Sequence, residues 1–241
     1  MTPVIGLVQA RMGSSRVPGK ALIDLAGKPL LWHMIDRLRR VPQVGPMVLA
    51  TTQDPRNAPM IALARSEGLA VYQHAEEDDL AGRVANAIAP LKGDLVLKVG
   101  GDCPLIDPAV LEGMVKLALA TDGADFVSNR INWSFPLGLS ADVVSRRSIE
   151  WSDANLHDPE DRELFAVYIR DHPDRFTVVS YTNDTDLSQH GWTVDEPEDV
   201  IFMRDIFDNL HRPGKVFAMQ DVLDYLDAKA AGASGQTEAS E

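Results

Sequence analysis

The sequence predicts an α/β fold with a mostly parallel, open sheet and helices on both of its faces. Short apolar runs typical of buried strands alternate with stretches of helical periodicity through the first 130 residues. Such alternation implies right-handed crossovers, and therefore parallel neighbours in the sheet. The chain has 241 residues and 45% apolar side chains, which suffices for a full core and excludes disorder as the main state.

Five strands and four helices are expected in the first part of the chain. The expected strands are short and rich in Val, Ile, Leu or aromatic residues, and they span 3–9, 46–51, 69–73, 94–99 and 125–128. The expected helices repeat apolar residues at i, i+3 and i+4, clearly at 30–38 and 110–117 and less regularly at 56–67 and 79–89.

The second part adds strands and loops around this unit. Strands are expected at 138–145, 175–181 and 191–194, and helices at 161–171 and 196–210. Pro197 suits the first turn of the last helix, where its missing N–H costs nothing. We see no linker and no internal repeat, so a single domain over 1–228 is expected. The Ala, Gly, Ser and Glu content of 229–241 predicts a disordered tail.

Charge and cysteine content restrict the partners. The net charge of −13 repels a polyphosphate backbone, so nucleic acid is not expected, whereas a small anion bound with a divalent metal is compatible. The single Cys103 excludes a disulfide framework and a Cys-based zinc site. Neither a leader pattern nor an apolar run near the ~18 residues of a membrane helix is present, so we expect a cytoplasmic protein.

The segment most informative about function is 9–20, QARMGSSRVPGK, directly after the first strand. Ligands of open α/β sheets bind at the carboxyl ends of strands, so this loop is well placed. A solvated loop with ordinary surface charges is the alternative. The features that suit phosphate are two glycines for close backbone approach, two hydroxyl donors and three cations: Gly13, Gly19, Ser14, Ser15, Arg11, Arg16 and Lys20.

Two common nucleotide loops do not match this segment. A P-loop requires four residues between its glycines and a hydroxyl residue after the lysine, but five residues separate Gly13 from Gly19, and Ala21 follows Lys20. The G-x-G-x-x-G dinucleotide fingerprint is also absent. Nicotinamide cofactors are therefore not indicated.

Three sequence blocks resemble motifs of a known family and occur in the same order as in that family. QARMGSSRVPGK continues into ALIDLAGKPLL, GGDCPLID at 100–107 is similar to a G-D-x-P-L-I motif, and WTVDEPED at 192–199 is similar to V-D-T-P-E-D. Together they resemble the sugar cytidylyltransferases, the relatives of CMP-Kdo and acylneuraminate synthetases. The branch they resemble most is that of the SpsF-type spore-coat polysaccharide biosynthesis proteins.

The resemblance implies a Rossmann-like nucleotide-diphospho-sugar transferase fold and transfer of CMP from CTP to an acidic or modified sugar, for surface polysaccharide. A sugar hydroxyl would attack the α-phosphorus, and pyrophosphate would leave. Partners would be CTP and a small sugar, and a homodimer is compatible. Arg11 and Lys20 would be catalytic, stabilising charge on the phosphates. The implied nucleotide-binding residues of the loop are Gln9, Ala10, Arg11, Gly13, Ser14, Ser15, Arg16 and Lys20.

Two carboxylates are the candidates for binding Mg²⁺, the expected cofactor. Asp102 and Asp195 each follow an expected strand, so both would project into one crevice, which suits a metal that also binds phosphate and water. Asp102 could instead be a turn residue before Pro104, and Asp195 an N-cap for the helix that begins at 196. Two glycines before Asp102 favour the metal; for Asp195 the two roles are nearly balanced.

A further segment is similar to the family's region near cytosine, and it provides Asp79 and Arg83 as nucleotide-binding candidates. Because they are four residues apart, a surface ion pair on one helix face explains them equally well.

The acceptor side departs from the branch's pattern. PLGLSAD at 136–142 stands for P-x-G-x-D-x-E, and RELFA at 162–166 stands for R-E-H-V-T. The resemblance assigns substrate binding to Asp142, Arg162 and Glu163, and Trp133 could stack on a sugar ring. Ser140 replaces an acidic residue, so either the acceptor differs or sugar chemistry has weakened. A glycosyltransferase of the same fold and a non-catalytic nucleotide-binding module are the alternative functions.

Overall fold

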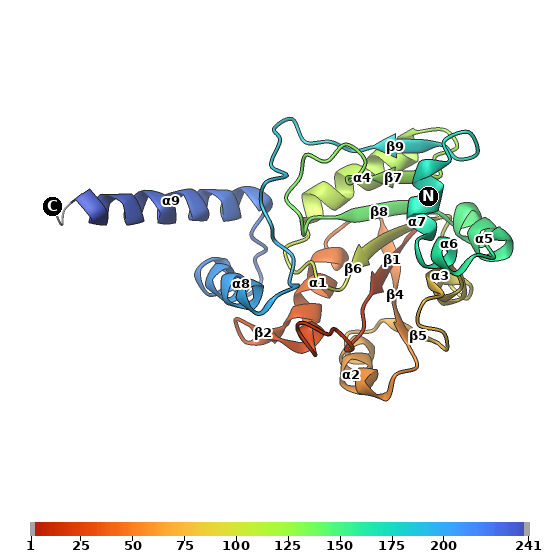
Figure 1. The fold of residues 1–241 in the computed structure, drawn as a ribbon, viewed down its shortest axis with the longest axis horizontal. Coiled ribbons are helices and arrows are strands. Elements are labelled where there is room, and N and C mark those ends of the chain that lie inside the picture. Colours follow the sequence, from red (N-terminus) through yellow and green to blue (C-terminus); the bar gives the residue numbers. More distant parts are fainter. Residues whose placement is uncertain (1–2, 239–241) are drawn as a thin grey trace.

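A computed structural model describes residues 3–238, and its centre is a seven-stranded sheet (Figure 1). Six strands run in one direction, and β8 alone runs against both of its neighbours. The mostly parallel sheet expected from the sequence is therefore confirmed. The strand order is β5 (Ala70–His74), β4 (Val44–Thr52), β1 (Val4–Gln9), β6 (Leu95–Gly100), β8 (Ala141–Ser145), β7 (Phe126–Ser128) and β9 (Val178–Ser180).

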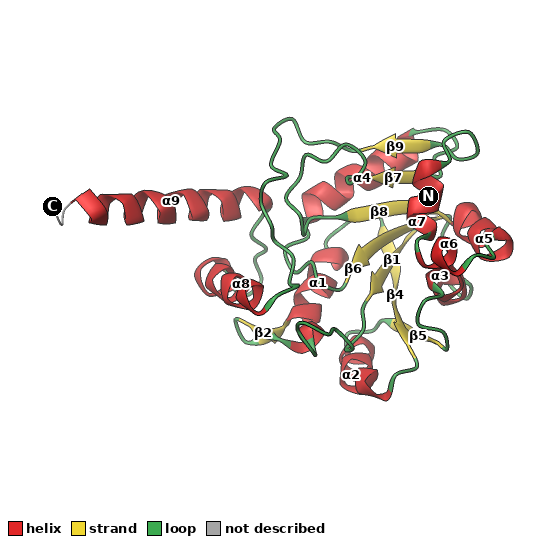
Figure 2. Cartoon of the chain, viewed as in Figure 1, coloured by secondary structure: helices red, strands yellow, loops and turns green. Residues whose placement is uncertain are grey.

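Helices cover both faces of this sheet, as expected (Figure 2). Successive strand residues alternate between the two faces, so Leu97 and Val99 join one apolar cluster and Val96 the other. The first cluster is covered by α1 (Leu30–Arg39), α2 (Ala58–Ser66), α4 (Pro108–Ala120) and α8 (Pro197–Leu210). The second is covered by α3 (Leu80–Ile88), α5 (Arg146–Asn155) and α7 (Phe165–Asp171), with α6 (Pro159–Glu163) preceding α7.

The structure corrects several boundaries in the second part of the chain. Residues 191–194 do not form a strand, because this segment lies beside a loop rather than beside another strand. Among the described residues, its one ladder-like contact is an isolated bridge between Gly191 and Leu137. The helix expected at 161–171 is interrupted at Leu164, which leaves the helical conformation between α6 and α7. The sequence did not reveal α5, whose polar residues lack an apolar repeat but whose N-cap Ser145 accepts a hydrogen bond from the Ser148 amide.

The C-terminal helix α9 (Met219–Glu238) differs from the expected disordered tail. Residues 229–238 continue this helix, and 239–241 lie outside the described residues. Its first turns are fixed to α8, because Tyr225 and Lys229 both donate to the Asp205 carboxylate, at 3.1 and 2.7 Å. Beyond them the helix extends away from the body of the molecule (Figure 1). Within the part of the chain that is described, no helix combines the length and apolarity needed to cross a membrane.

Candidate active site

A cavity of about 770 Å³ opens at the carboxyl ends of β1 and β6. Its walls come from the loop after β1, the ends of β6 and β8, the segment joining α6 to α7, and the residues just before α8. Most of the candidates from the sequence line it: Gln9, Ala10, Arg11, Gly13, Ser14, Ser15, Arg16, Lys20, Arg83, Asp102, Asp142, Glu163 and Asp195. Three candidates, Asp79, Trp133 and Arg162, are not among its lining residues.

The loop after β1 is shaped by local backbone constraints. Gly19 has φ of +75°, a left-handed conformation that favours glycine, and its N–H donates to the Met12 carbonyl at 3.1 Å. Gly101 permits close contact between the ends of β1 and β6, because a Cβ there would lie 2.5 Å from the Ala10 Cβ. The second glycine before Asp102 therefore has a structural purpose, contrary to the expectation that favoured a metal there.

Lys20 connects the loop to both candidate carboxylates. Its Nζ donates to Asp195 Oδ1 at 3.2 Å and to the Val194 carbonyl at 2.8 Å, and lies 3.5 Å from Asp102 Oδ2. Burial alone would raise the pKa of Asp195, but the hydrogen bond and charge of Lys20 outweigh it and hold that pKa below its ordinary value. The two carboxylates thus converge on a single cation, facing the cavity.

The helix that follows Asp195 is capped by other residues. The N-cap of α8 is Glu196, and the Asp199 carboxylate accepts from the backbone N–H groups of both Asp195 and Glu196 at 2.8 Å. The interpretation of Asp195 as the N-cap is therefore wrong. Its side chain is directed to Lys20 instead, which leaves it available to a ligand in the cavity.

The donor set fits Mg²⁺. In proteins this ion is usually held by one or two carboxylates, with phosphate and water completing the octahedron. Asp102 and Asp195 supply two partly exposed carboxylates beside the loop after β1. Among the residues that the structure describes, no cluster of three or more Asp, Glu, His or Cys side chains forms a larger candidate metal site.

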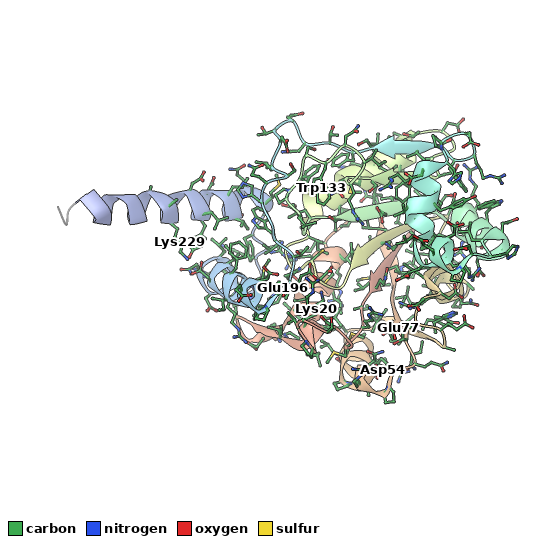
Figure 3. The ribbon with its side chains drawn as sticks, viewed as in Figure 1. Lys20, Asp54, Glu77, Trp133, Glu196 and Lys229 are labelled. Atoms are coloured by element: carbon green, nitrogen blue, oxygen red, sulfur yellow. The ribbon has the colours of Figure 1, made fainter. Side chains whose placement is uncertain are left out.

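The other two cations of the loop also have carboxylate partners. Arg11 pairs with Glu77, and Arg16 pairs with Glu196 and lies 3.6 Å from Asp195. Figure 3 labels Lys20, Glu196 and Glu77 around this part of the molecule. The sequence did not single out Glu77 or Glu196, because the partners lie 66 and 180 residues away along the chain.

The structure separates Asp79 from Arg83. Asp79 is the N-cap of α3 and pairs with Arg162 at 2.8 Å and with His74 at 3.0 Å. Burial alone would raise the pKa of Asp79, but its hydrogen bonds, above all the one from Arg162, outweigh burial and hold that pKa below its ordinary value. Arg83 is buried, lines the cavity and donates to the Glu77 carbonyl. The surface ion pair between Asp79 and Arg83 is therefore not formed.

Arg162 and Trp133 have structural partners outside the cavity lining. Besides Asp79, Arg162 binds the Asp153 carboxylate at 2.8 Å, which joins α3 to the end of α5. The Trp133 indole N–H donates to the Phe135 carbonyl at 2.8 Å, and the residue is 41% exposed. Figure 3 shows it well apart from Lys20. Stacking of Trp133 on a sugar within the cavity has no support from this placement.

Asp142 lines the cavity together with Lys98, a residue that the sequence analysis did not single out. Its carboxylate accepts from Ser128 Oγ at 2.7 Å and from Lys98 Nζ at 3.3 Å. The available signal was a charged residue, Lys98, inside the apolar run of β6.

This fold and site define a class of protein. An open α/β sheet that carries a basic, glycine-containing loop and two carboxylates at adjoining strand ends is typical of enzymes that bind nucleotides with a divalent metal. Comparison with known proteins identifies the family. The chain belongs to the cytidylyltransferases, whose family model matches residues 5–233, and these enzymes are nucleotidyltransferases.

Individual relatives agree with this assignment. The chain is 28% identical over 206 residues to the spore coat polysaccharide biosynthesis protein SpsF of Bacillus subtilis, covering 83% of this chain and 84% of SpsF. It is 35% identical over 120 residues to 3-deoxy-manno-octulosonate cytidylyltransferase of Trichlorobacter lovleyi, an alignment spanning 50% of this chain and 46% of that enzyme. The solved structure of a cytidylyltransferase from Leptospira borgpetersenii superposes with a TM-score of 0.88 at 26% identity, over 96% of both chains.

Proposed function

We propose that this protein transfers CMP from CTP to a hydroxyl of an acidic or modified sugar and releases pyrophosphate. The observation that carries the proposal is the position of Lys20 between Asp102 and Asp195, at the mouth where Arg11 and Arg16 also lie. A triphosphate is the ligand that needs three cations and a metal-binding pair of carboxylates in one place. The cavity volume is within the range of small-molecule sites.

In this mechanism the loop cations position the triphosphate and stabilise charge. The sugar oxygen attacks the α-phosphorus, the bond to the pyrophosphate oxygen breaks, and the hydroxyl proton leaves to solvent or to a cavity carboxylate. Arg11 and Lys20 neutralise charge that increases on the α- and β-phosphate oxygens, and Arg16 binds the terminal phosphate. Gly13, Ser14 and Ser15 line the same wall.

Asp102 and Asp195 would hold Mg²⁺ in this reaction. When bound, the ion neutralises phosphate oxygens as a Lewis acid. In the structure the Lys20 ammonium lies between the two carboxylates and balances one of their two negative charges. With Mg²⁺ held by Asp102 and Asp195, Lys20 would be available to bind a phosphate oxygen.

The physiological setting is part of the proposal. The names of the relatives support an acidic sugar and a role in surface polysaccharide synthesis. We further propose that residues 1–228 act as one nucleotidyltransferase domain, which agrees with the single large sheet built from both parts of the chain. A cytoplasmic location and a homodimer stay predictions, and light scattering tests the second against the 26.4 kDa monomer.

Nucleotide-dependent thermal stability tests the proposal. A ligand that binds only the folded state stabilises it, so CTP with Mg²⁺ should raise Tm more than ATP, GTP or UTP. Equal shifts for all four nucleotides would contradict the cytidylyl assignment. A CTP-specific shift without pyrophosphate release from any acidic sugar would favour a non-catalytic nucleotide-binding module. The family match makes the glycosyltransferase alternative the weaker one.

A further inference from the structure

One face of the sheet changes from apolar to polar where it reaches the cavity. Beneath α3, α5 and α7, Val96 lies opposite Val144, and Val144 opposite Phe126. Two residues further along each strand, on the same face, Lys98 lies opposite Asp142, and Asp142 opposite Ser128. We call Lys98, Asp142 and Ser128 the polar row.

The polar row is a buried ion pair with one side open to the cavity. The Lys98 and Asp142 side chains are only 13% and 6% exposed, and both line the cavity. An ammonium group has three donors, and Asp142 is the one partner of the Lys98 ammonium within residues 3–238. A buried ion pair contributes little to stability in comparison with well-packed apolar residues. A ligand-binding role is the better explanation for its presence in this wall.

Arg130 is an exposed cation that also lines the cavity. It follows β7, and its backbone N–H donates to Ser128 Oγ at 3.1 Å. The other cavity cations each have a carboxylate or carbonyl partner: Arg11, Arg16, Lys20, Arg83 and Lys98. In the described part of the chain, the Arg130 guanidinium has neither an ion pair nor a hydrogen bond to a protein group, although the protein carries a net charge of −13.

The sheet order separates Arg130 and Ser128 from the triphosphate loop, whereas Lys98 lies on β6, directly beside β1. In the order β1, β6, β8, β7, neighbouring strands lie about 4.8 Å apart, so β7 is roughly 14 Å from the strand that leads into the loop. Arg83, on α3, lies on the opposite side, where α3 packs against β4 and β5. The cavity therefore has a nucleotide side and an acceptor side. Arg130, Ser128 and Asp142 belong to the second, and Lys98 lies where the two sides meet.

We infer that Arg130 and the polar row form the acceptor subsite, in which Arg130 binds an anionic group and Lys98 with Asp142 binds neighbouring hydroxyls. A sugar hydroxyl both donates and accepts, so one hydroxyl accepts from Lys98 while it or its neighbour donates to Asp142. Guanidinium groups bind carboxylate and phosphate in the same bidentate way. The acceptor is therefore a polyhydroxylated sugar that carries one of these two groups. This inference rests on the proposed function.

The charge of Arg130 is tested first. Pyrophosphate release is measured with CTP and Mg²⁺ and with two probes that both keep a free anomeric hydroxyl, 3-deoxy-manno-octulosonate as a carboxylate and mannose 6-phosphate as a phosphate. The probe that the wild type uses identifies the anionic group. Arg130→Gln should raise KM for that probe about 10- to 100-fold, as expected for a lost hydrogen bond to a charged group, and leave KM for CTP unchanged. Arg65→Gln, an exposed arginine on α2 outside the cavity, is the control and should match the wild type.

The polar row is tested with single and double variants. Lys98→Met and Asp142→Asn should each lower Tm, because each leaves one buried charge without its partner. The double variant removes both charges, and the amide oxygen introduced by Asp142→Asn can still accept from Ser128, so Tm should recover. If the polar row binds the acceptor, each single variant should raise KM for the probe roughly tenfold or more. The double variant should show the same increase in KM although its Tm has recovered. A purely structural ion pair predicts that acceptor KM recovers with stability.

The possible failures are distinguishable. If the wild type turns over neither probe, the acceptor class in the proposed function is wrong and this inference falls with it. If the wild type turns over a probe and both Arg130→Gln and the double variant keep the wild-type KM for it, the inference alone is wrong. A KM for CTP that rises together with that of the probe would also overturn the assignment to the acceptor side.

Discussion

At the scale of single residues, each cation of the proposed phosphate loop, residues 9–20, has a carboxylate partner within the protein. Arg11 pairs with Glu77, Arg16 with Glu196, and Lys20 with Asp195. In the proposed function, such pairs hold long side chains close to the triphosphate site, and phosphate oxygens would replace the carboxylate oxygens when the triphosphate binds. Because the first two pairs are exposed, their contribution to stability is small and their exchange is easy.

Removing a loop cation should therefore impair catalysis more than folding. We expect Lys20→Ala and Arg11→Ala each to lower kcat/KM for pyrophosphate release by roughly 10²-fold or more, because preorganised charge at a phosphoryl group contributes about 3 kcal/mol. Lys92→Ala, an exposed lysine outside the cavity, is the matched control. Steady-state kinetics with CTP and an acidic sugar provide the measurement, and wild-type activity in both variants would contradict the role of the loop.

Asp195 and Asp199 allow metal binding to be separated from helix capping. We expect Asp195→Asn to keep Tm, since Glu196 and Asp199 cap α8, but to lose activity at limiting Mg²⁺ and regain part of it at high Mg²⁺. Asp199→Ala should do the reverse, lowering stability by about 1 kcal/mol at nearly unchanged turnover. Thermal unfolding and a Mg²⁺ titration of activity distinguish the two. Asp102→Asn should behave like Asp195→Asn; full turnover there at low Mg²⁺ would place the metal elsewhere.

At the scale of elements, strands and helices with strong periodicity were predictable, and those stabilised by tertiary partners were not. The strands from β1 to β9 that form the large sheet all fall within or beside the apolar runs seen in the sequence. α5 is missing from the prediction because it is held by its N-cap and by buried Ile149 rather than by an apolar face. The pairing of Asp79 with Arg162 joins residues 83 apart, which periodicity in a single segment cannot reveal.

The junction of β1 and β6 is the element contact on which the site depends most. The Gly101 N–H donates to the Gln9 carbonyl at 2.8 Å, and an added Cβ would lie 3.0 Å from that oxygen and from the Ala10 Cα. We expect Gly101→Ala to lower both Tm and kcat/KM, because the phosphate loop must shift relative to Asp102. Gly191→Ala, where a Cβ would contact nothing within 4 Å, should leave both unchanged. Equal values for the two variants would show that the loop tolerates displacement.

At the scale of the whole molecule, the site is assembled from distant parts of the chain. Lys20 and Asp195 are 175 residues apart, and Arg16 and Glu196 are 180 apart. The sequence placed Asp102 and Asp195 at one edge of the sheet because both follow apolar runs. It could not predict which carboxylates neutralise which cations, since such pairs depend on how α8 and its preceding loop return to the end of β1.

A buried histidine links three distant parts of the fold and makes stability depend on pH. His33 in α1 hydrogen-bonds the Leu25 carbonyl at 2.7 Å and packs against Phe207 of α8, with ring centroids 4.4 Å apart. Burial, with smaller contributions from His211 and Arg37, lowers the pKa of His33 to about 4 against the opposing effects of the Leu25 hydrogen bond and Asp36. The folded protein therefore keeps this imidazole neutral at pH values where the unfolded chain protonates it.

This depressed pKa predicts a loss of stability in mild acid. Between the unfolded pKa near 6.5 and the folded value of about 4, the unfolded state binds more protons, so unfolding becomes more favourable as pH falls. We expect the free energy of unfolding to fall by up to about 3 kcal/mol across this range, measured by urea unfolding. His33→Gln keeps a donor for the Leu25 carbonyl without titrating, so its stability should change much less with pH. His157→Gln, at an exposed position, should retain the wild-type slope, and an equal slope in His33→Gln would assign the acid sensitivity to other groups.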